Sequence, residues 1–116
     1  MSTILRGIPL KTIESELRFV CHDWHSRFQY VDNRRTDTIL GEVYDVTNIE
    51  SYNRYHVFVP DLPPVMDMEE FEQMQENGQK LFLEFQDATV TPYYNERSRS
   101  IEDSIRAKGV RIVKEF

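Results

Sequence analysis

The sequence predicts a mainly β domain with one helix, and three observations support this prediction. Several short segments alternate apolar and polar residues with the period of two that is typical of strands. Only one segment spaces its apolar residues three and four apart, as a helix does. The chain has 116 residues, of which 40% are hydrophobic and 12% aromatic. This size and composition suit one domain, residues 1–116, with a single core.

The first predicted strand is defined by the alternation of Leu17, Phe19 and Cys21. Continuing the same period places a second set of residues on the other side of the strand: His22, Trp24, Ser26, Phe28 and Tyr30. The strand is therefore either long or turns back as a hairpin arm near residues 32–33, and both alternatives stay open.

Two more strands precede the predicted helix. Residues 38–46 form the second strand, in which Gly41 indicates a bulge or the close approach of another backbone. Residues 54–59 form the third strand, which Pro60 ends because proline has no N–H to donate.

The helix is predicted between residues 67 and 77, with acidic residues in its first turn and Gly78 as its C-cap. Residues 80–91 predict a fourth strand that Pro92 closes, and residues 105–113 predict a fifth. The order of elements is therefore β-β-β-α-β-β. Residues 1–12 give no structural prediction.

Five strands with one helix between the third and the fourth is the order found in the OB-fold. That fold is a partly open five-stranded barrel that binds oligonucleotides or oligosaccharides. We therefore expect an OB-fold-like barrel, and the alternative is an α+β sheet with one packed helix.

The negative charge is concentrated in one part of the chain. There are 20 acidic and 14 basic residues, a net charge of −6. Residues 61–87 contain eight acidic residues and one base, so the remainder is close to neutral. This distribution excludes diffuse polycation binding, and any site for an anion must be local.

Outside the acidic segment, arginines lie next to aromatic residues in three clusters. Arginine contacts phosphates, and aromatic faces stack on bases at about 1–3 kcal/mol per base, whatever the base. The clusters therefore predict a surface for single-stranded nucleic acid. Its candidate residues are Trp24, Arg27, Phe28, Tyr30, Arg34, Arg35, Tyr52, Arg54, Tyr55, Tyr93, Tyr94, Arg97 and Arg99. The alternative is a non-enzymatic protein-interaction module, because the same residue types form hot spots.

The sequence predicts neither an enzyme nor a bound metal or cofactor. Potential ligands crowd residues 21–25, but they alternate in direction along a strand, and a structural zinc ion takes four ligands. The four glycines do not form a phosphate-binding loop. No apolar run is long enough to span a membrane, and no signal peptide is recognisable. Together with the lone Cys21, these features predict a cytoplasmic protein.

Four segments carry a family resemblance. They are a Tyr-Asp-Val strand at 42–46, an aliphatic strand ending in proline at 55–60, a strand near residue 83 and an aliphatic strand at 109–113. These segments resemble small accessory proteins of Gram-positive conjugative elements, the helicase processivity factors of integrative and conjugative elements and their plasmid relatives. The resemblance implies a cytoplasmic protein without catalytic residues that coats single-stranded DNA during rolling-circle or transfer replication and assists a host helicase.

The expected function is therefore sequence-independent binding of single-stranded DNA, in the replication or transfer of a mobile element or phage. The expected partners are single-stranded DNA and a helicase or another replication or transfer protein. Association into a homo-oligomer is compatible with the sequence, and no membrane partner is expected.

Overall fold

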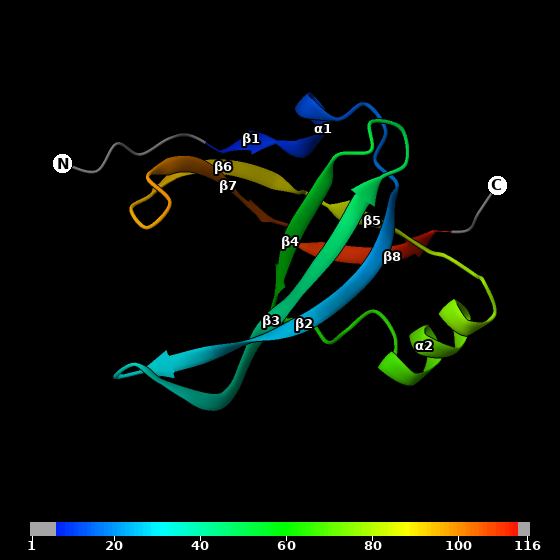
Figure 1. The fold of residues 1–116 in the computed structure, drawn as a ribbon, viewed down its shortest axis with the longest axis horizontal. Coiled ribbons are helices and arrows are strands. Elements are labelled where there is room, and N and C mark those ends of the chain that lie inside the picture. Colours follow the sequence, from blue (N-terminus) through cyan, green and yellow to red (C-terminus); the bar gives the residue numbers. More distant parts are fainter. Residues whose placement is uncertain (1–6, 114–116) are drawn as a thin grey trace.

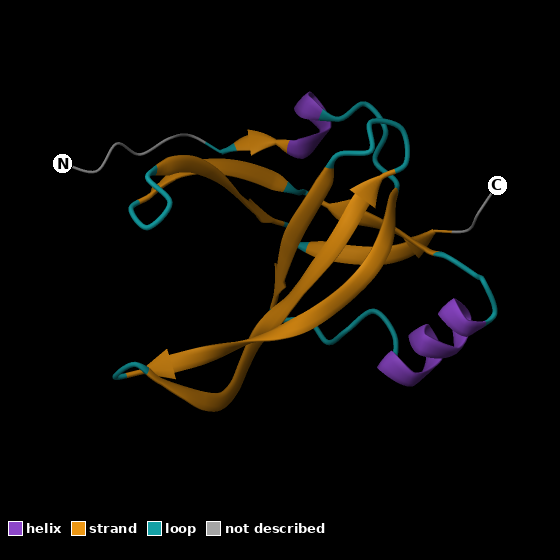
Figure 2. Cartoon of the chain, in the orientation of Figure 1, coloured by secondary structure: helices purple, strands orange, loops and turns teal. Residues whose placement is uncertain are grey.

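The structure, a computed structural model that describes residues 7–113, consists of one eight-stranded sheet and two helices (Figures 1 and 2). The elements are β1 (Ile8–Pro9), α1 (Leu10–Ile13), β2 (Phe19–Val31), β3 (Arg34–Asn48), β4 (Arg54–Pro60), α2 (Met68–Glu76), β5 (Leu81–Gln86), β6 (Thr89–Asn95), β7 (Ser100–Arg106) and β8 (Gly109–Val113). The predicted mainly β class is confirmed. In residues 7–113, no helix is long and apolar enough to cross a membrane.

The strands are ordered β1-β6-β7-β4-β3-β2-β5-β8, and the sheet is not closed. All neighbours are antiparallel except β4 and β7, which run parallel and share only two residue pairs, Val57 with Ile105 and Phe58 with Arg106. This junction joins the unit β1-β6-β7 to the rest of the sheet.

The C-terminal strands differ from the prediction. The single strand expected at 80–91 is divided into β5 and β6 by a turn in which Asp87 has a φ of 50°. The strand expected at 105–113 is likewise divided between β7 and β8. Pro92 does not end a strand but lies within β6, beyond the two residues that β1 covers. Its missing N–H therefore costs no ladder bond on that side.

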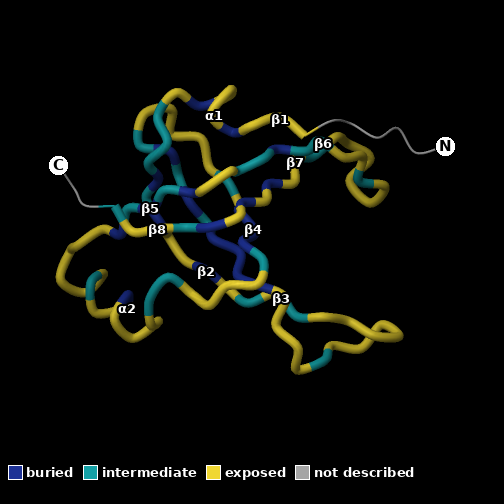
Figure 3. The backbone as a smooth tube through the Cα atoms, turned by 180° about the vertical axis from the view of Figure 1, so that it is seen from behind, coloured by how far each residue is buried: buried dark blue, intermediate teal, exposed yellow. Residues whose placement is uncertain are grey.

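The N-terminal strands agree more closely with the prediction. Strand β2 is long and also turns back as a hairpin, because Asp32 and Asn33 adopt φ values of 52° and 63°, the left-handed pair of a tight hairpin turn. The far part of this hairpin extends beyond the core and is largely exposed (Figures 1 and 3). Helix α2 follows the strand predicted as the third, here β4.

The core lies on one face of the sheet and includes Phe19, Tyr44 and Leu83. Helix α2 contributes a single buried residue, Phe71. A register shift between Cys21 and Asp23 inserts one residue into β2, so side chains beyond it change faces. Cys21 and Trp24 therefore both enter the core.

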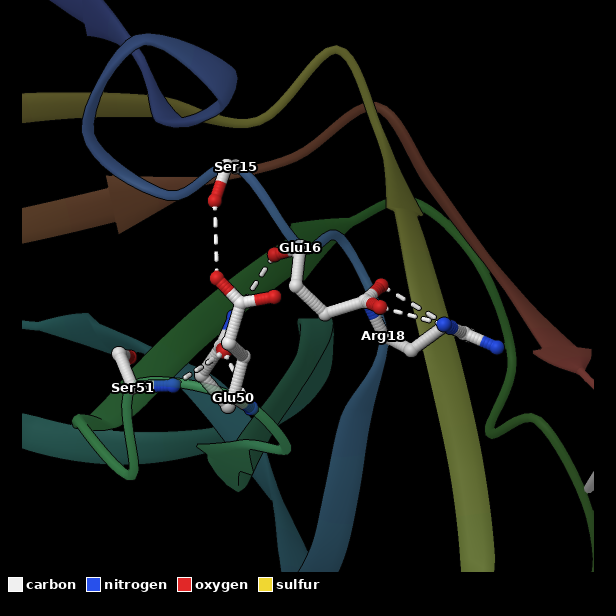
Figure 4. A network of polar contacts seen from close by, with 6 residues as sticks. Ser15, Glu16, Arg18, Glu50 and Ser51 are labelled. Carbon is white, nitrogen blue, oxygen red and sulfur yellow. Dashed lines mark hydrogen bonds and ion pairs between the residues drawn. The ribbon is translucent and has the colours of Figure 1, made fainter.

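Buried polar groups fix the turn between β3 and β4. The side chain of Asn48, which is fully buried, donates to the Glu16 carbonyl at 2.7 Å and accepts from the Glu50 and Ser51 amides at 2.9 and 3.0 Å. Figure 4 shows the surrounding contacts, in which Ser15 donates to the Glu50 carboxylate at 3.0 Å and Glu16 pairs with Arg18. The turn is thereby held against the segment that leads into β2.

Candidate nucleic-acid interface

Two arginines from different strands stack on Phe58, on the face of the sheet opposite the core. The Arg27 guanidinium lies 4.2 Å from the centre of the Phe58 ring, and that of Arg106 lies 5.2 Å from it. The ring is only 6% exposed. Such stacking contributes about 0.5–1 kcal/mol at an exposed site and leaves the edge N–H groups of a guanidinium available for a phosphate.

Gly41 makes this stacking possible. Strand β3 presents Gly41 opposite Arg27 on one side and Pro60 on the other. A Cβ atom at position 41 would lie 2.3 Å from the Val59 carbonyl oxygen and 2.9 Å from Cε1 of Phe58. The close backbone approach predicted at Gly41 is therefore confirmed, and a side chain there would displace the Phe58 ring.

The far part of the β2–β3 hairpin, residues 27–40, is named the β2–β3 arm and carries a second stacked pair. The Arg35 guanidinium lies 4.0 Å from the centre of the Phe28 ring. Tyr30 stands opposite Arg35 in the register and is 65% exposed, and Arg34 follows the turn. The structure thus brings this predicted cluster together, except for Trp24.

The hairpin of β6 and β7, residues 93–101, is named the β6–β7 arm. Arg97 and Arg99 lie in its exposed turn, and Tyr94 is 61% exposed. The Tyr93 hydroxyl donates to the Glu102 carboxylate at 3.0 Å, which raises the pKa of Tyr93. Hydrogen bonds from Asn95 and Tyr93 lower the pKa of Glu102. The two arms project to the same side in Figure 1, and α2 lies on the other side.

Trp24 does not offer the exposed face that the sequence predicts. It is 5% exposed, and its ring centre lies 4.8 Å from that of Phe71 and 5.9 Å from that of Tyr44. The register shift that turns Trp24 into the core explains the error, since uninterrupted alternation would direct it outward.

Tyr55 is also committed to internal contacts. Its ring packs edge-on against Phe19 at a centroid distance of 6.0 Å, and its hydroxyl donates to the buried Glu14 carboxylate at 2.8 Å. Burial and this hydrogen bond raise the pKa of Tyr55 to about 12. Tyr55 is therefore half-buried with its hydroxyl engaged, and its role as a stacking face stays a prediction.

The remaining two residues of that predicted cluster lie apart from the arms. Arg54 makes two hydrogen bonds to the Asp45 carboxylate, which lower the pKa of Asp45 and neutralise the cation. Tyr52 is 79% exposed, but it follows the end of β3 opposite to the β2–β3 arm. The eight residues of β3 that follow Leu40, up to Asn48, span roughly 25 Å at about 3.3 Å per residue.

The arginines between residues 7 and 113 fall into two groups, those with an ion-pair partner and those without one. Arg18, Arg54 and Arg111 form ion pairs with Glu16, Asp45 and Glu84. In this part of the chain the other arginines have no ion pair, and all of them lie on the two arms or on the Phe58 surface: Arg27, Arg34, Arg35, Arg97, Arg99 and Arg106. We refer to these six as the unpaired arginines.

Phe58 and Arg106 were absent from the predicted site. No local pattern brings the two together, because Phe58 and Arg106 meet only through the parallel pairing of β4 and β7, which are distant in sequence. The alternation within residues 54–59 does show that Phe58 faces away from Val57 and Val59, so a large ring outside the core was the available signal.

The structure places Cys21, the thiol of the cluster at residues 21–25, in the core. Within residues 7–113, no group of three or more His, Cys, Asp and Glu side chains is arranged to hold a metal ion. Burial raises the pKa of the Cys21 thiol to about 12, so the nucleophilic thiolate is scarce at neutral pH.

The unpaired arginines and the exposed tyrosines of the two arms supply cations and flat groups, which match the chemistry of an extended anion with accessible flat groups. Single-stranded nucleic acid has this chemistry, with phosphates for the guanidinium groups and bases for the tyrosine faces. Comparison of the chain with protein-family models, with curated proteins and with solved structures finds no match.

Proposed function

We propose that the protein binds single-stranded DNA with little sequence preference. The observation that carries the proposal is the set of six unpaired arginines in a chain with a net charge of −6. Acidic residues outnumber basic ones, yet none of them neutralises these six within residues 7–113. Exposed guanidinium groups without a carboxylate partner are available to phosphates at little desolvation cost.

The proposed contacts divide into two kinds. Arg27 and Arg106, oriented by stacking on Phe58, would bind phosphates on the sheet surface. Tyr30 and Tyr94, the most exposed aromatic side chains of the two arms, would stack on bases. Neither contact reads a base edge, so little discrimination between sequences is expected.

The sequence resemblance extends this proposal to a biological setting. We propose an accessory protein of a conjugative element or phage, which acts in the cytoplasm and assists a helicase or another replication or transfer protein. The order β2, β3, β4, α2, β5 supports a relation to the OB-fold, although the sheet here has eight strands and open ends.

A protein-interaction module is the second candidate, and one observation favours it. The arms expose apolar side chains, with Ile39 at 55%, Leu40 at 38% and Ile101 at 68%. Apolar groups of this kind are typical of protein partners rather than of phosphate backbones.

Salt dependence separates the two candidates. Fluorescence anisotropy with labelled single strands and with duplex of the same sequence should show binding to the single strand only. The logarithm of the association constant should fall with the logarithm of salt at about −0.7 per phosphate contact, hence about −4 if all six arginines take part. Absence of binding at low salt, or equal binding of duplex, would refute the proposal.

A further inference from the structure

A small pocket lies between strands β2 and β3 and the loop that joins β4 to α2. The strands supply residues 24–26 and Glu42, and the other wall is formed by the end of the loop and the start of α2. The pocket has a volume of about 410 Å³ and is open to solvent. The loop is held in place over the sheet, because the Val65 amide donates to the Tyr44 hydroxyl at 3.0 Å.

Glu42 brings a buried carboxylate to this pocket. The residue is only 3% exposed, and it lies on the same face of β3 as the core residue Tyr44, two positions along the strand. Ser26, opposite Glu42 in the register, donates its hydroxyl to the carboxylate, at 3.0 and 2.9 Å from the two oxygens. A hydroxyl has one proton, whereas a carboxylate accepts about four hydrogen bonds. The Glu42 carboxylate therefore keeps unused acceptor sites.

The Glu42 carboxylate has no cation beside it. Among residues 7–113, no lysine, arginine or histidine forms an ion pair with Glu42. Arg27 is close in sequence to Ser26, but its guanidinium stacks on Phe58, on the opposite face of the sheet. Asp67 adds a second carboxylate to the lining, and its side chain does not cap α2. Because a buried carboxylate is costly unless a cation or several donors compensate it, the pocket favours a cationic ligand.

The rest of the lining indicates which kind of cation fits. Met66, Met68 and the two prolines of the loop, Pro63 and Pro64, line the pocket with apolar atoms. A cation with a short alkyl stem matches both parts of the lining. A guanidinium group suits the carboxylate better than an ammonium group, because its planar N–H donors match two carboxylate oxygens and it is more weakly hydrated.

We propose that this pocket binds an alkylguanidinium cation, the chemistry of an arginine side chain. The guanidinium group donates to the Glu42 carboxylate, and the alkyl stem lies on Met66 and Met68. The surrounding charge attracts such a ligand, because residues 61–87 contain eight acidic residues and one base, and that base, Lys80, does not line the pocket. The inference is independent of DNA binding, which is proposed for the unpaired arginines.

An amide NMR titration of the full chain with butylguanidinium tests this proposal. The matched probe is butylurea, which has nearly the same shape without the charge. Butylguanidinium should shift the amides of residues 24–26, 42 and 65–68, and butylurea should bind at least about tenfold more weakly, because a hydrogen bond to a charged group is lost. Equal affinity of the two probes, or shifts confined to other residues, would overturn the proposal.

A third probe, acetylarginine amide, distinguishes the two sources of an alkylguanidinium group. If it binds at least as tightly as butylguanidinium, the pocket accepts an arginine of a polypeptide. If butylguanidinium alone binds, the pocket takes a free small molecule.

Two carboxylate variants complete the test. Glu42→Gln should weaken binding of butylguanidinium at least about tenfold, whereas Glu69→Gln, which neutralises an exposed residue of α2 outside the pocket, should change it less than about twofold. The urea midpoint of Glu42→Gln should equal or exceed that of the wild type, because a buried carboxylate without a cation becomes a neutral amide. A lower midpoint, or equal effects of the two variants on binding, would overturn the proposal.

Discussion

Replacing Arg27 and Arg106 together by alanine tests whether the unpaired arginines contact phosphates. The double variant removes two proposed contacts, so the salt slope of oligonucleotide binding should become less negative by about 1.4. At about 0.1 M salt, this corresponds to roughly 25-fold weaker binding. The measurement is fluorescence anisotropy of a labelled single strand over a range of salt concentrations.

The matched control is the double variant Arg54→Ala with Arg111→Ala, which removes the same number of charges. Both arginines are exposed but pair with Asp45 and Glu84. Their loss should leave the salt slope unchanged within error. If both double variants reduce the slope equally, binding depends only on net charge, and the proposed surface is wrong.

A third double variant separates charge from stacking. Arg27→Lys with Arg106→Lys keeps two cations but replaces the planar groups that lie over Phe58. The salt slope should stay near that of the wild type, while the unfolding midpoint should fall slightly, because the stacking contributes about 0.5–1 kcal/mol per pair.

Three further predictions concern the fold. Gly41→Ala should lower the free energy of unfolding by about 2 kcal/mol in a denaturant titration, because its Cβ meets the backbone of β4 at 2.3 Å; an unchanged midpoint would contradict that contact. The emission of the buried Trp24 should stay constant when a single strand is added and shift to the red on unfolding, whereas quenching by DNA would contradict its burial. The hydrogen bond from Arg18 lowers the pKa of Glu16 from 4.5 to about 2, so this pair contributes stability that is present above pH 4.5 and lost as the pH falls toward 2. Urea midpoints of Glu16→Gln should therefore depend less on pH in that window, and an identical dependence in the two proteins would refute this reasoning.

The sequence predicted the elements whose causes are local. The alternation up to Tyr30 and the residues at 32–33 left open a long strand or a hairpin arm, and β2 has both features. A tight turn and a period of two are read from adjacent residues. Helix α2 was predicted within one residue at each end, from its spacing, its acidic first turn and Gly78. The arginines and aromatic residues of the two arms were also visible in the sequence, because they are close neighbours along the chain.

Features that depend on distant segments were not predictable. The register shift after Cys21 depends on how β2 pairs with β3, and it alone decides that Trp24 is buried. Arg106 joins Phe58 only because β7 runs parallel to β4. The hydrogen bond of the Tyr55 hydroxyl likewise depends on Glu14, which is 41 residues away in the chain.

The short parallel junction between β4 and β7 has a consequence for local opening. The unit β1-β6-β7 is joined to the other strands by two residue pairs, by the hydrogen bond from the Ala107 amide to the Phe58 carbonyl at 2.9 Å, and by core side chains such as Val90. A region with so few connecting hydrogen bonds opens at a lower free energy than the whole domain.

Arg106 lies on β7 and Arg27 on β2, so the two arginines that stack on Phe58 come from opposite sides of the junction between β4 and β7. A single strand of DNA bound to both arginines would connect the unit β1-β6-β7 to the other strands of the sheet. The DNA would have to be released before the two parts separate. DNA binding would then reduce the opening of the unit β1-β6-β7, and the β6 and β7 amides would exchange hydrogen more slowly in the bound state.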